Sequence, residues 1–289
     1  MKDHMQQNNT YSVRDLLNIH ALKLTKSKGQ NFLVDPGVPA RITKQSGVDK
    51  QCGVLEVGPG LGALTTELAK VAGHVTAVEL DKRLVPILHD IFAETQNVSI
   101  IQGDILKTNI KELVSSTMND LAYHVCANLP YNITTPVITA FIEAEAFETI
   151  TIMIQKEVAL RICASPGSPQ YGAFTVFANY HTAPKILFDV SPECFIPRPK
   201  VTSTVIKMDV HSKRSLDKES EEVFFRVVRA AFGQRRKTLV NALTAVFGKS
   251  YKKEEIENIV EKCGFNILVR GEVLSIDDFI KLSACFGDA

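Results

Sequence analysis

The sequence of 289 residues contains no tryptophan, no pair of cysteines in a C-x-x-C spacing and no long apolar run. Its six cysteines are scattered and its histidines are not grouped at zinc-ligand spacing, so we expect reduced thiols in an intracellular protein and no metal site. No stretch approaches the ~18 apolar residues of a membrane-spanning helix, and residues 1–10 lack the apolar segment of a secretory signal. These absences predict a cytoplasmic protein with no membrane partner.

The chain also lacks an excess of either charge, because 33 basic and 32 acidic residues leave a formal net charge of +1. A nucleic-acid partner is therefore not indicated by the overall charge and has to be sought in local clusters. The length and the 45% of hydrophobic residues suit one large domain, or one medium and one small domain, with a buried core.

The most informative stretch is VLEVGPGLG, residues 54–62. An apolar β-branched run, three alternating glycines and an apolar-periodic segment over 63–72 predict a strand, a tight turn and a helix. Glycine accepts positive φ and has no Cβ, so such a turn lets a ligand approach the backbone and the helix N-terminus. The spacing does not name the ligand, because Gly58, Gly60 and Ala63 also fit the dinucleotide pattern G-x-G-x-x-G/A. A purely structural turn is the alternative.

Strands and helices alternate after this turn, which is typical of a parallel, doubly wound sheet. Strands are predicted over 75–80, 98–102, 123–127 and 150–154, and helices over 39–46, 83–95, 136–145 and 156–163. Apolar-alternating segments follow over 171–180, 185–190 and 201–210, and the last two would complete the sheet as an antiparallel pair. In such sheets ligands bind beyond the carboxyl ends of the strands.

Two acidic residues stand at these strand ends. Glu79 lies 21 positions after Gly58, where a carboxylate can accept hydrogen bonds from a ribose diol. Asp104 follows the third strand and could accept from an exocyclic amine such as adenine N6. Each alone could instead cap the next helix, but together they favour a bound adenosine.

The tetrapeptide Asn128-Leu129-Pro130-Tyr131 follows the fourth strand. Proline fixes φ and removes a donor, so we expect a rigid rim with free carbonyl oxygens. Such oxygens can accept the N–H hydrogens of an exocyclic amine while an aromatic ring stacks on the face of the base. The alternative is a proline turn with a tyrosine in the core.

Positive charge is concentrated near the C-terminus, in residues 222–245. Arg226, Arg229 and either Arg236 or Lys237 recur at helical spacing beside a separate apolar face, and Arg235-Arg236-Lys237 is a dense cationic group. A solvated helix face is the alternative to an RNA-binding one. Two further helices are predicted over 253–263 and 275–286.

Together these motifs resemble the ribosomal RNA adenine dimethyltransferase family. Asn-Leu-Pro-Tyr is similar to the N/D-P-P-Y/F motif of S-adenosylmethionine-dependent N6-adenine methyltransferases. The resemblance spans residues 29–286 and includes GQNFL (29–33), EVGPGLG (56–62), VELD (78–81), GD (103–104) and FIPRPKVTS (195–203). Residues 224–243 resemble the housekeeping small-subunit branch rather than the Erm branch. Lys28 and Gly233 depart from the usual pattern, but neither stands at an expected ligand contact.

The resemblance implies a Rossmann-like, seven-stranded class I methyltransferase sheet with a small C-terminal all-helical domain. The implied parts are a basic N-terminal arm (1–28), a methyltransferase domain (29–210) and a helical RNA-binding domain (211–289). The implied cofactor is S-adenosylmethionine, held by Asn31, Leu33, Gly58, Glu79, Asp104 and Asn128. The implied catalytic residues are Asn128, Leu129, Pro130 and Tyr131. The implied RNA contacts are Arg198, Lys200, Arg226, Arg229, Arg235, Arg236 and Lys237.

The implied reaction is N6,N6-dimethylation of two adjacent adenosines in the 3′-terminal hairpin loop of 16S rRNA, carried out by a monomer on the immature small ribosomal subunit. Three alternatives stay open. A NAD-type dehydrogenase fits the glycine turn but gives residues 128–131 no role. A non-catalytic RNA-binding relative would keep the basic helix, and an Erm-type enzyme would modify 23S rRNA and confer macrolide resistance.

Overall fold

The computed structural model describes residues 31–213, 215–234 and 236–286. The predicted basic arm (1–28) and Arg235 lie outside the described residues. The described chain forms two compact units. The sheet unit contains the residues up to Lys156 together with Ile186–Asp209, and the helical unit contains Glu157–Lys185 and the residues from Val210 onward.

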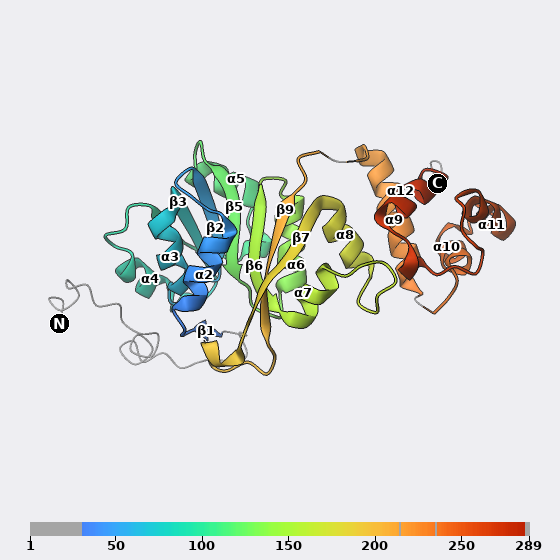
Figure 1. The fold of residues 1–289 in the computed structure, drawn as a ribbon. Coiled ribbons are helices and arrows are strands. Elements are labelled where there is room, and N and C mark those ends of the chain that lie inside the picture. Colours follow the sequence, from blue (N-terminus) through green and yellow to red (C-terminus); the bar gives the residue numbers. More distant parts are fainter. Residues whose placement is uncertain (1–30, 214, 235, 287–289) are drawn as a thin grey trace. The chain divides into compact units, whose positions relative to one another are not determined.

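Seven strands form the main sheet, in the order β4-β3-β2-β5-β6-β9-β7 (Figure 1). Strands β2 to β6 pair in parallel, and β9 is antiparallel to β6. The strand order reverses between β2 and β5, and in doubly wound sheets the ligand crevice lies at this reversal. The bounds are β2 (Cys52–Val57), β3 (His74–Glu79), β4 (Val98–Gln102), β5 (Ala122–Asn128), β6 (Thr149–Gln155), β7 (Thr182–Val190) and β9 (Ser203–Val210).

The strand sequences follow their places in the sheet. All six residues of the central strand β2 are buried, and all except Glu56 lack a charged side chain, as expected for a parallel strand covered on both faces. The edge strand β4 is only partly buried and carries Ser99 and Gln102. The helices of the sheet unit are α2 (Gly37–Ser46), α3 (Ala63–Val71), α4 (Val85–Ile91), α5 (Ile110–Thr117) and α6 (Thr134–Glu143). The predicted strands and helices of this unit are therefore confirmed, and α5 is a helix that was not predicted.

A short second sheet lies beside the main one. Strands β1 (Phe32–Leu33) and β8 (Phe195–Ile196) pair in an antiparallel manner. Pairing continues one residue further, because the Val34 N–H donates to the Cys194 carbonyl oxygen at 2.9 Å. This sheet ties the GQNFL segment to the start of the FIPRPKVTS loop, two motifs that are far apart in the sequence.

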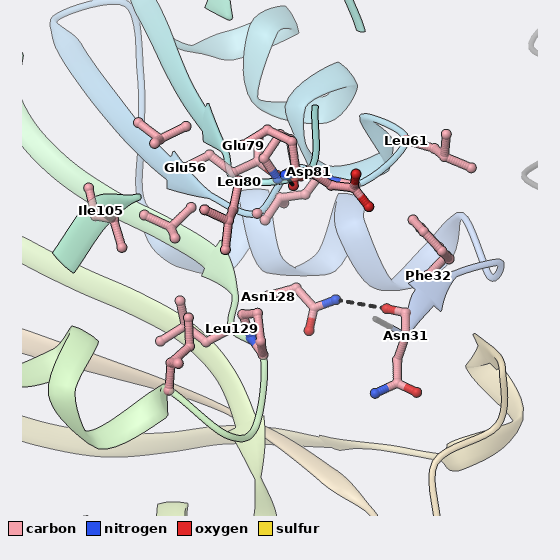
Figure 2. Close-up of a pocket in the computed structure, with 18 of the residues that line it drawn as sticks. Asn31, Phe32, Glu56, Leu61, Glu79, Leu80, Asp81, Ile105, Asn128 and Leu129 are labelled. Atoms are coloured by element: carbon pink, nitrogen blue, oxygen red, sulfur yellow. Dashed lines mark hydrogen bonds between the residues drawn. The ribbon is translucent and has the colours of Figure 1, made fainter. Parts of the chain in front are cut away.

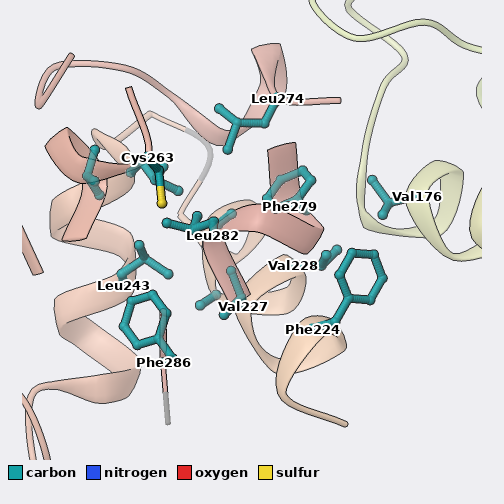
Figure 3. Packing of buried hydrophobic residues seen from close by; sticks show 14 of the residues in the cluster. Val176, Phe224, Val227, Val228, Leu243, Cys263, Leu274, Phe279, Leu282 and Phe286 are labelled. Atoms are coloured by element: carbon teal, nitrogen blue, oxygen red, sulfur yellow. The ribbon is translucent and has the colours of Figure 1, made fainter. Parts of the chain in front are cut away.

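The helical unit contains α8 (Ala173–His181), α9 (Lys218–Gly233), α10 (Leu239–Phe247), α11 (Lys253–Lys262), α12 (Ile276–Ser283) and nearly all of α7 (Lys156–Ile162). Its core is built from the apolar faces of α9, α10 and α12, with Phe224, Leu243 and Phe279 among the buried side chains (Figure 3). Helix α9 ends at Gly233 and α10 begins at Leu239, after Thr238, whose hydroxyl accepts from the Asn241 N–H. Arg236 and Lys237 lie between these helices, so the expected helical spacing with Arg226 and Arg229 does not extend to them.

The alternating pattern of residues 171–180, which is typical of a strand, does not form one here. Most of this segment belongs to the helix α8 (Ala173–His181). Val176 and Tyr180, four residues apart, lie on one helix face and are buried in the helical core, and the Tyr180 ring lies 4.8 Å from the Phe224 ring. The Tyr171 hydroxyl donates to the Leu274 carbonyl oxygen at 2.9 Å. These contacts explain why Glu157–Lys185 groups with the C-terminal helices, although the resemblance implies a methyltransferase domain over 29–210.

None of the helices in the described residues is both long enough and apolar enough to span a bilayer.

Candidate cofactor and target-base site

A cavity of about 320 Å³ lies in the sheet unit, at the carboxyl ends of β2, β3, β4 and β5 (Figure 2). This volume is at the lower end of the roughly 300–1,000 Å³ of small-molecule sites. The structure brings all six predicted cofactor contacts and all four predicted catalytic residues to this cavity: Asn31, Leu33, Gly58, Glu79, Asp104, Asn128, Leu129, Pro130 and Tyr131, with Asn128 counted in both sets.

The glycine turn between β2 and α3 forms one wall. Gly58, Gly60 and Gly62 have φ values of +70°, +62° and +81°, a region that strains any residue with a Cβ. The Gly58 N–H donates to the Val78 carbonyl oxygen at 2.9 Å, which ties the turn to β3. Gly60 packs against Phe32, since a Cβ at Gly60 would lie 3.1 Å from the ring. The predicted turn therefore has a conformation that only glycine adopts without strain.

Gly62→Ala is expected to destabilise the sheet unit more than Gly47→Ala. Both glycines have φ near +80°, and this conformation alone costs about 1–2 kcal/mol for a residue with a Cβ. At Gly62 the new Cβ would also lie 2.7 Å from the Phe92 ring, whereas at Gly47 it would only approach the flexible end of Lys207 at 3.4 Å. Overpacking should add about 1–3 kcal/mol. Denaturant unfolding of the two variants measures the difference, and equal losses would contradict it.

The acidic residues of the cavity are largely buried. Burial raises the pKa of Glu79, and the N–H groups of Asp81 and Gly60 oppose this shift by donating to its carboxylate at 2.7 and 3.3 Å. The Leu80 N–H also lowers this pKa, and because a carboxylate has about four lone-pair sites, part of the acceptor capacity remains for a ligand. Burial also raises the pKa of Glu56 to about 8, although the Thr65 hydroxyl donates to it at 2.6 Å. Glu56 is therefore mostly protonated at neutral pH.

Asp104 has a local structural role as well as its place in the cavity. Its carboxylate accepts from the Leu106 N–H at 3.1 Å and caps the short helical turn Ile105–Lys107. Lys107 Nζ lies 3.8 Å from the other carboxylate oxygen. The capping role that the sequence left open is therefore present, and it leaves the carboxylate on the cavity wall.

The side-chain amide of Asn128 has a defined orientation. Its Nδ2 donates to the Asn31 carbonyl oxygen at 3.3 Å (Figure 2). Because a carbonyl oxygen only accepts, the amide nitrogen faces Asn31 and Oδ1 is turned the other way. In the described part of the chain no donor bonds to this oxygen, so Oδ1 remains available to a ligand in the cavity.

The carbonyl oxygens of Leu129 and Pro130 differ in their partners. The Pro130 oxygen accepts from the Ile133 N–H and the Thr134 hydroxyl, both at 3.2 Å, where α6 begins. Among the described residues no donor bonds to the Leu129 oxygen, while the Leu129 N–H donates to the Met153 carbonyl oxygen at 3.1 Å. The neighbouring Tyr131 ring is half-buried, and its hydroxyl lies 2.7 Å from Ser203 Oγ.

Several cavity residues were not selected from the sequence. Phe32, Leu61, Leu80 and Ile105 all line the cavity. Leu80 is 63% exposed, which is unusual for so large an apolar side chain beside a cavity. The sequence could have indicated three of them as cavity residues. Leu80 follows Glu79, Ile105 follows Asp104, and Phe32 lies within GQNFL. An apolar residue next to a predicted polar contact can supply the wall against which a planar ring packs.

The predicted RNA contacts do not line the cavity. In the sheet unit, Lys200 is exposed, and Arg198 Nη2 lies 3.1 Å from Glu193 Oε1. In the helical unit, Arg229, Arg236 and Lys237 are exposed, whereas the Arg226 guanidinium lies 4.6 Å from the centre of the Phe247 ring. The Arg226 contact also helps hold α9 against α10.

Comparison with known proteins decides the family. The family model described as "Ribosomal RNA adenine dimethylase" matches residues 21–282. The chain belongs to the ribosomal RNA adenine dimethylase family. This membership confirms the predicted class of enzyme, a dimethylase of adenine in ribosomal RNA, and excludes the NAD-type dehydrogenase.

Curated members of the dimethylase family cover almost the whole chain. It is 43% identical to "Ribosomal RNA small subunit methyltransferase A" of Clostridium botulinum (strain Loch Maree / Type A3), over 96% of this chain and 99% of the relative. It is 42% identical to the protein of the same name from Shouchella clausii (strain KSM-K16), over 93% of this chain and 91% of the relative. These names give the Erm alternative less support.

Two solved structures share the fold. A dimethyladenosine transferase from Plasmodium falciparum has a TM-score of 0.75 at 24% identity, covering 87% of this chain and 95% of that one. The 23S rRNA methyltransferase ErmE has a TM-score of 0.69 at 24% identity, covering 88% of this chain and 99% of that one. The predicted Rossmann-like sheet with a C-terminal helical region is therefore confirmed.

Proposed function

We propose that the protein transfers methyl groups from S-adenosylmethionine to N6 of two adjacent adenosines in the 3′-terminal hairpin loop of 16S rRNA. We further propose that it acts as a cytoplasmic monomer on the immature small ribosomal subunit. One observation carries the proposed chemistry: Glu79 and Asn128 line the same cavity, and Asn128 Oδ1 has no donor among the described residues. The choice of small-subunit RNA is supported by the names of the relatives.

The charges of the cavity favour S-adenosylmethionine over a dinucleotide. Glu79, Asp81 and Asp104 supply the carboxylates of the cavity, whereas Glu56 lines it mostly in its protonated form. No Lys, Arg or His is found among the described lining residues. A pyrophosphate would lack a cationic partner in such surroundings, whereas a positively charged sulfonium suits them. The Glu79 carboxylate keeps acceptor sites for a ribose diol, and the apolar side chains suit an adenine ring.

Asn128 and Leu129 are proposed to activate the target amine. S-adenosylmethionine supplies a methyl group that is already activated by its sulfonium centre. Adenine N6 is a poor nucleophile, because its lone pair is delocalised into the ring. Asn128 Oδ1 and the Leu129 carbonyl oxygen accept the two N6 hydrogens, which favours a pyramidal nitrogen with a localised lone pair. Pro130 contributes its fixed φ rather than its carbonyl oxygen, which α6 already occupies.

No side chain needs to act as a general base in this scheme. When N6 takes the methyl group, the bond from sulfur to that methyl would break and S-adenosylhomocysteine would leave. The methylated amine is then positively charged and acidic, and it releases its proton to water. After the first transfer one N6 hydrogen remains, so a single acceptor from Asn128 or Leu129 can orient the amine for the second. The stacking of the base is assigned to the Tyr131 ring.

RNA binding is assigned to the seven predicted RNA contacts. These are Arg198 and Lys200 on the FIPRPKVTS loop, and Arg226, Arg229, Arg235, Arg236 and Lys237 near the C-terminus. Arg229, Arg236 and Lys237 are exposed, as phosphate contacts require. Arg226 is also held by Phe247, so its removal would disturb packing as well as charge.

Arg236→Ala/Lys237→Ala is expected to weaken binding to small-subunit RNA and to reduce its dependence on salt. Each lost phosphate contact lowers the slope of log K against log salt by about 0.7–0.9, so the double variant should lose about 1.4–1.8. The control, Lys249→Ala/Lys252→Ala, removes two exposed cations from the same unit and should leave most of the slope unchanged. Equal slopes for wild type and Arg236→Ala/Lys237→Ala would mean that these two cations are only solvated.

The proposed substrate is tested in a competition assay in which the protein is mixed with purified small and large ribosomal subunits. Small and large ribosomal subunits from strains lacking the respective modifications are incubated with S-adenosylmethionine that carries a labelled methyl group. We expect the label in 16S rRNA alone. Label in 23S rRNA would support the Erm alternative, and no transfer to either RNA would support a non-catalytic relative.

A further inference from the structure

The FIPRPKVTS loop ends at a buried hydroxyl that contacts the proposed stacking ring. Ser203 is the first residue of β9, its exposed fraction is 0%, and its Oγ lies 2.7 Å from the Tyr131 hydroxyl oxygen. Burial raises the pKa of Tyr131, so the phenol stays protonated at neutral pH and the contact is a hydrogen bond between two hydroxyls. Ser203 does not line the cavity itself and therefore acts through Tyr131.

The backbone around Ser203 is held on both sides. The carbonyl oxygen of Thr202 accepts from the Lys156 N–H at 3.0 Å. The Thr204 hydroxyl donates to Asp189 Oδ1 at 2.6 Å, and Lys156 Nζ donates to the other oxygen of the same carboxylate at 2.5 Å. Ser203 Oγ therefore projects from a fixed point of the sheet and can hold a mobile ring in place.

The other end of the loop is tied to the Asn128 half of the site. Phe195 and Ile196 pair with β1, and the residue before β1, Asn31, accepts the hydrogen bond from the Asn128 amide. One loop thus connects the two groups that are assigned to the target base, the amide at one end and the aromatic ring at the other.

We propose that Ser203 is a positioning residue, whose hydroxyl fixes the orientation of the Tyr131 ring that stacks on the target adenine. This inference rests on the proposed function. A tyrosine ring turns about two side-chain torsions, and a hydrogen bond at its far end restricts both of them. A ring held in one plane presents N6 to its acceptors in a reactive geometry, so the loss of this bond lowers the rate of transfer more than it lowers affinity.

A double-mutant cycle tests the inference. Ser203→Ala and Tyr131→Phe each remove one partner of the same hydrogen bond, and the double variant removes both. We expect each single variant to lower the single-turnover rate of methylation by roughly two- to tenfold, the size of one hydrogen bond. The half-saturating concentrations of small subunits and cofactor should change little. In the Tyr131→Phe background, Ser203→Ala should cause no further loss.

Two results would overturn the role of Ser203. The first is a wild-type rate for the Ser203→Ala variant. The second is an equal loss of rate when Ser203→Ala is introduced into the wild type and into the Tyr131→Phe variant, which would indicate a general effect on β9. The control is Thr76→Val, which removes a hydroxyl–hydroxyl hydrogen bond of 2.9 Å to Thr117, away from the cavity, and should leave the rate unchanged. The wild-type reaction in the same assay reports separately on the proposed function.

Discussion

Asn128→Ala is expected to slow methyl transfer to small subunits by roughly 10²-fold or more, as for the loss of one preorganised polar group in an active site. The lost oxygen is needed most when N6 becomes pyramidal, so RNA binding should barely change. Because Asn128 also lines the proposed cofactor cavity, the rate has to be measured in single turnover at saturating S-adenosylmethionine. Asn258→Ala, at an exposed position of α11, is the matched control.

Variants of Tyr131 separate stacking from hydrogen bonding at the same site. Tyr131→Ala removes stacking worth about 1–3 kcal/mol per base, whereas Tyr131→Phe keeps the ring and loses only the bond to Ser203. The expected order of single-turnover rates is wild type, then Tyr131→Phe, then Tyr131→Ala and Asn128→Ala. An Asn128→Ala enzyme that dimethylates at nearly the wild-type rate would mean that another group holds the amine.

Glu79→Ala is expected to weaken S-adenosylmethionine binding by about 2–3 kcal/mol, or roughly 30- to 150-fold in Kd, the value of charge-assisted hydrogen bonds to a ribose diol. The loss should be large because Glu79 is only 5% exposed, so water does not easily replace the missing acceptor. Calorimetry with S-adenosylmethionine and with S-adenosylhomocysteine measures the change in affinity. NAD should bind neither to the wild type nor to the Glu79→Ala variant.

Two further variants test whether the expected loss of cofactor affinity comes from the Glu79 carboxylate. Glu79→Gln keeps the shape and one acceptor oxygen, so its affinity should fall between those of wild type and Glu79→Ala. Glu94→Ala removes an exposed carboxylate that does not line the cavity and should bind as the wild type does. Unchanged affinity in Glu79→Ala would remove Glu79 from the cofactor site.

Local patterns were sufficient to predict the sheet and the cavity. The strand before Gly58, the glycine turn and the polar residues after each strand are short, contiguous signals, and parallel strands bring their carboxyl ends to one edge. Helix α5 was not predicted, because its last turn carries Ser115, Ser116 and Thr117, which have low helix propensity. The alternation of residues 171–180 was misread, because two apolar residues four apart also mark a helix face.

The details of the site depend on contacts that no short pattern reveals. Asn31 and Asn128, 97 positions apart, orient the amide, and Tyr131 and Ser203, 72 positions apart, hold the ring. The sequence left open whether the Leu129 or the Pro130 carbonyl oxygen serves the amine. Only the turn into α6 shows that the Pro130 oxygen is already paired. Such tertiary hydrogen bonds require the folded sheet before they can be recognised.

The most direct test of the account is to map the methyl groups that the wild-type protein adds. Small subunits from a strain lacking the modification are incubated with the protein and S-adenosylmethionine, and nuclease fragments of their 16S rRNA are analysed by mass spectrometry. We predict that the fragment with the 3′-terminal hairpin loop gains two N6,N6-dimethyladenosines at adjacent positions. A fragment that stays unmodified, or methyl groups at other positions only, would contradict the proposed function.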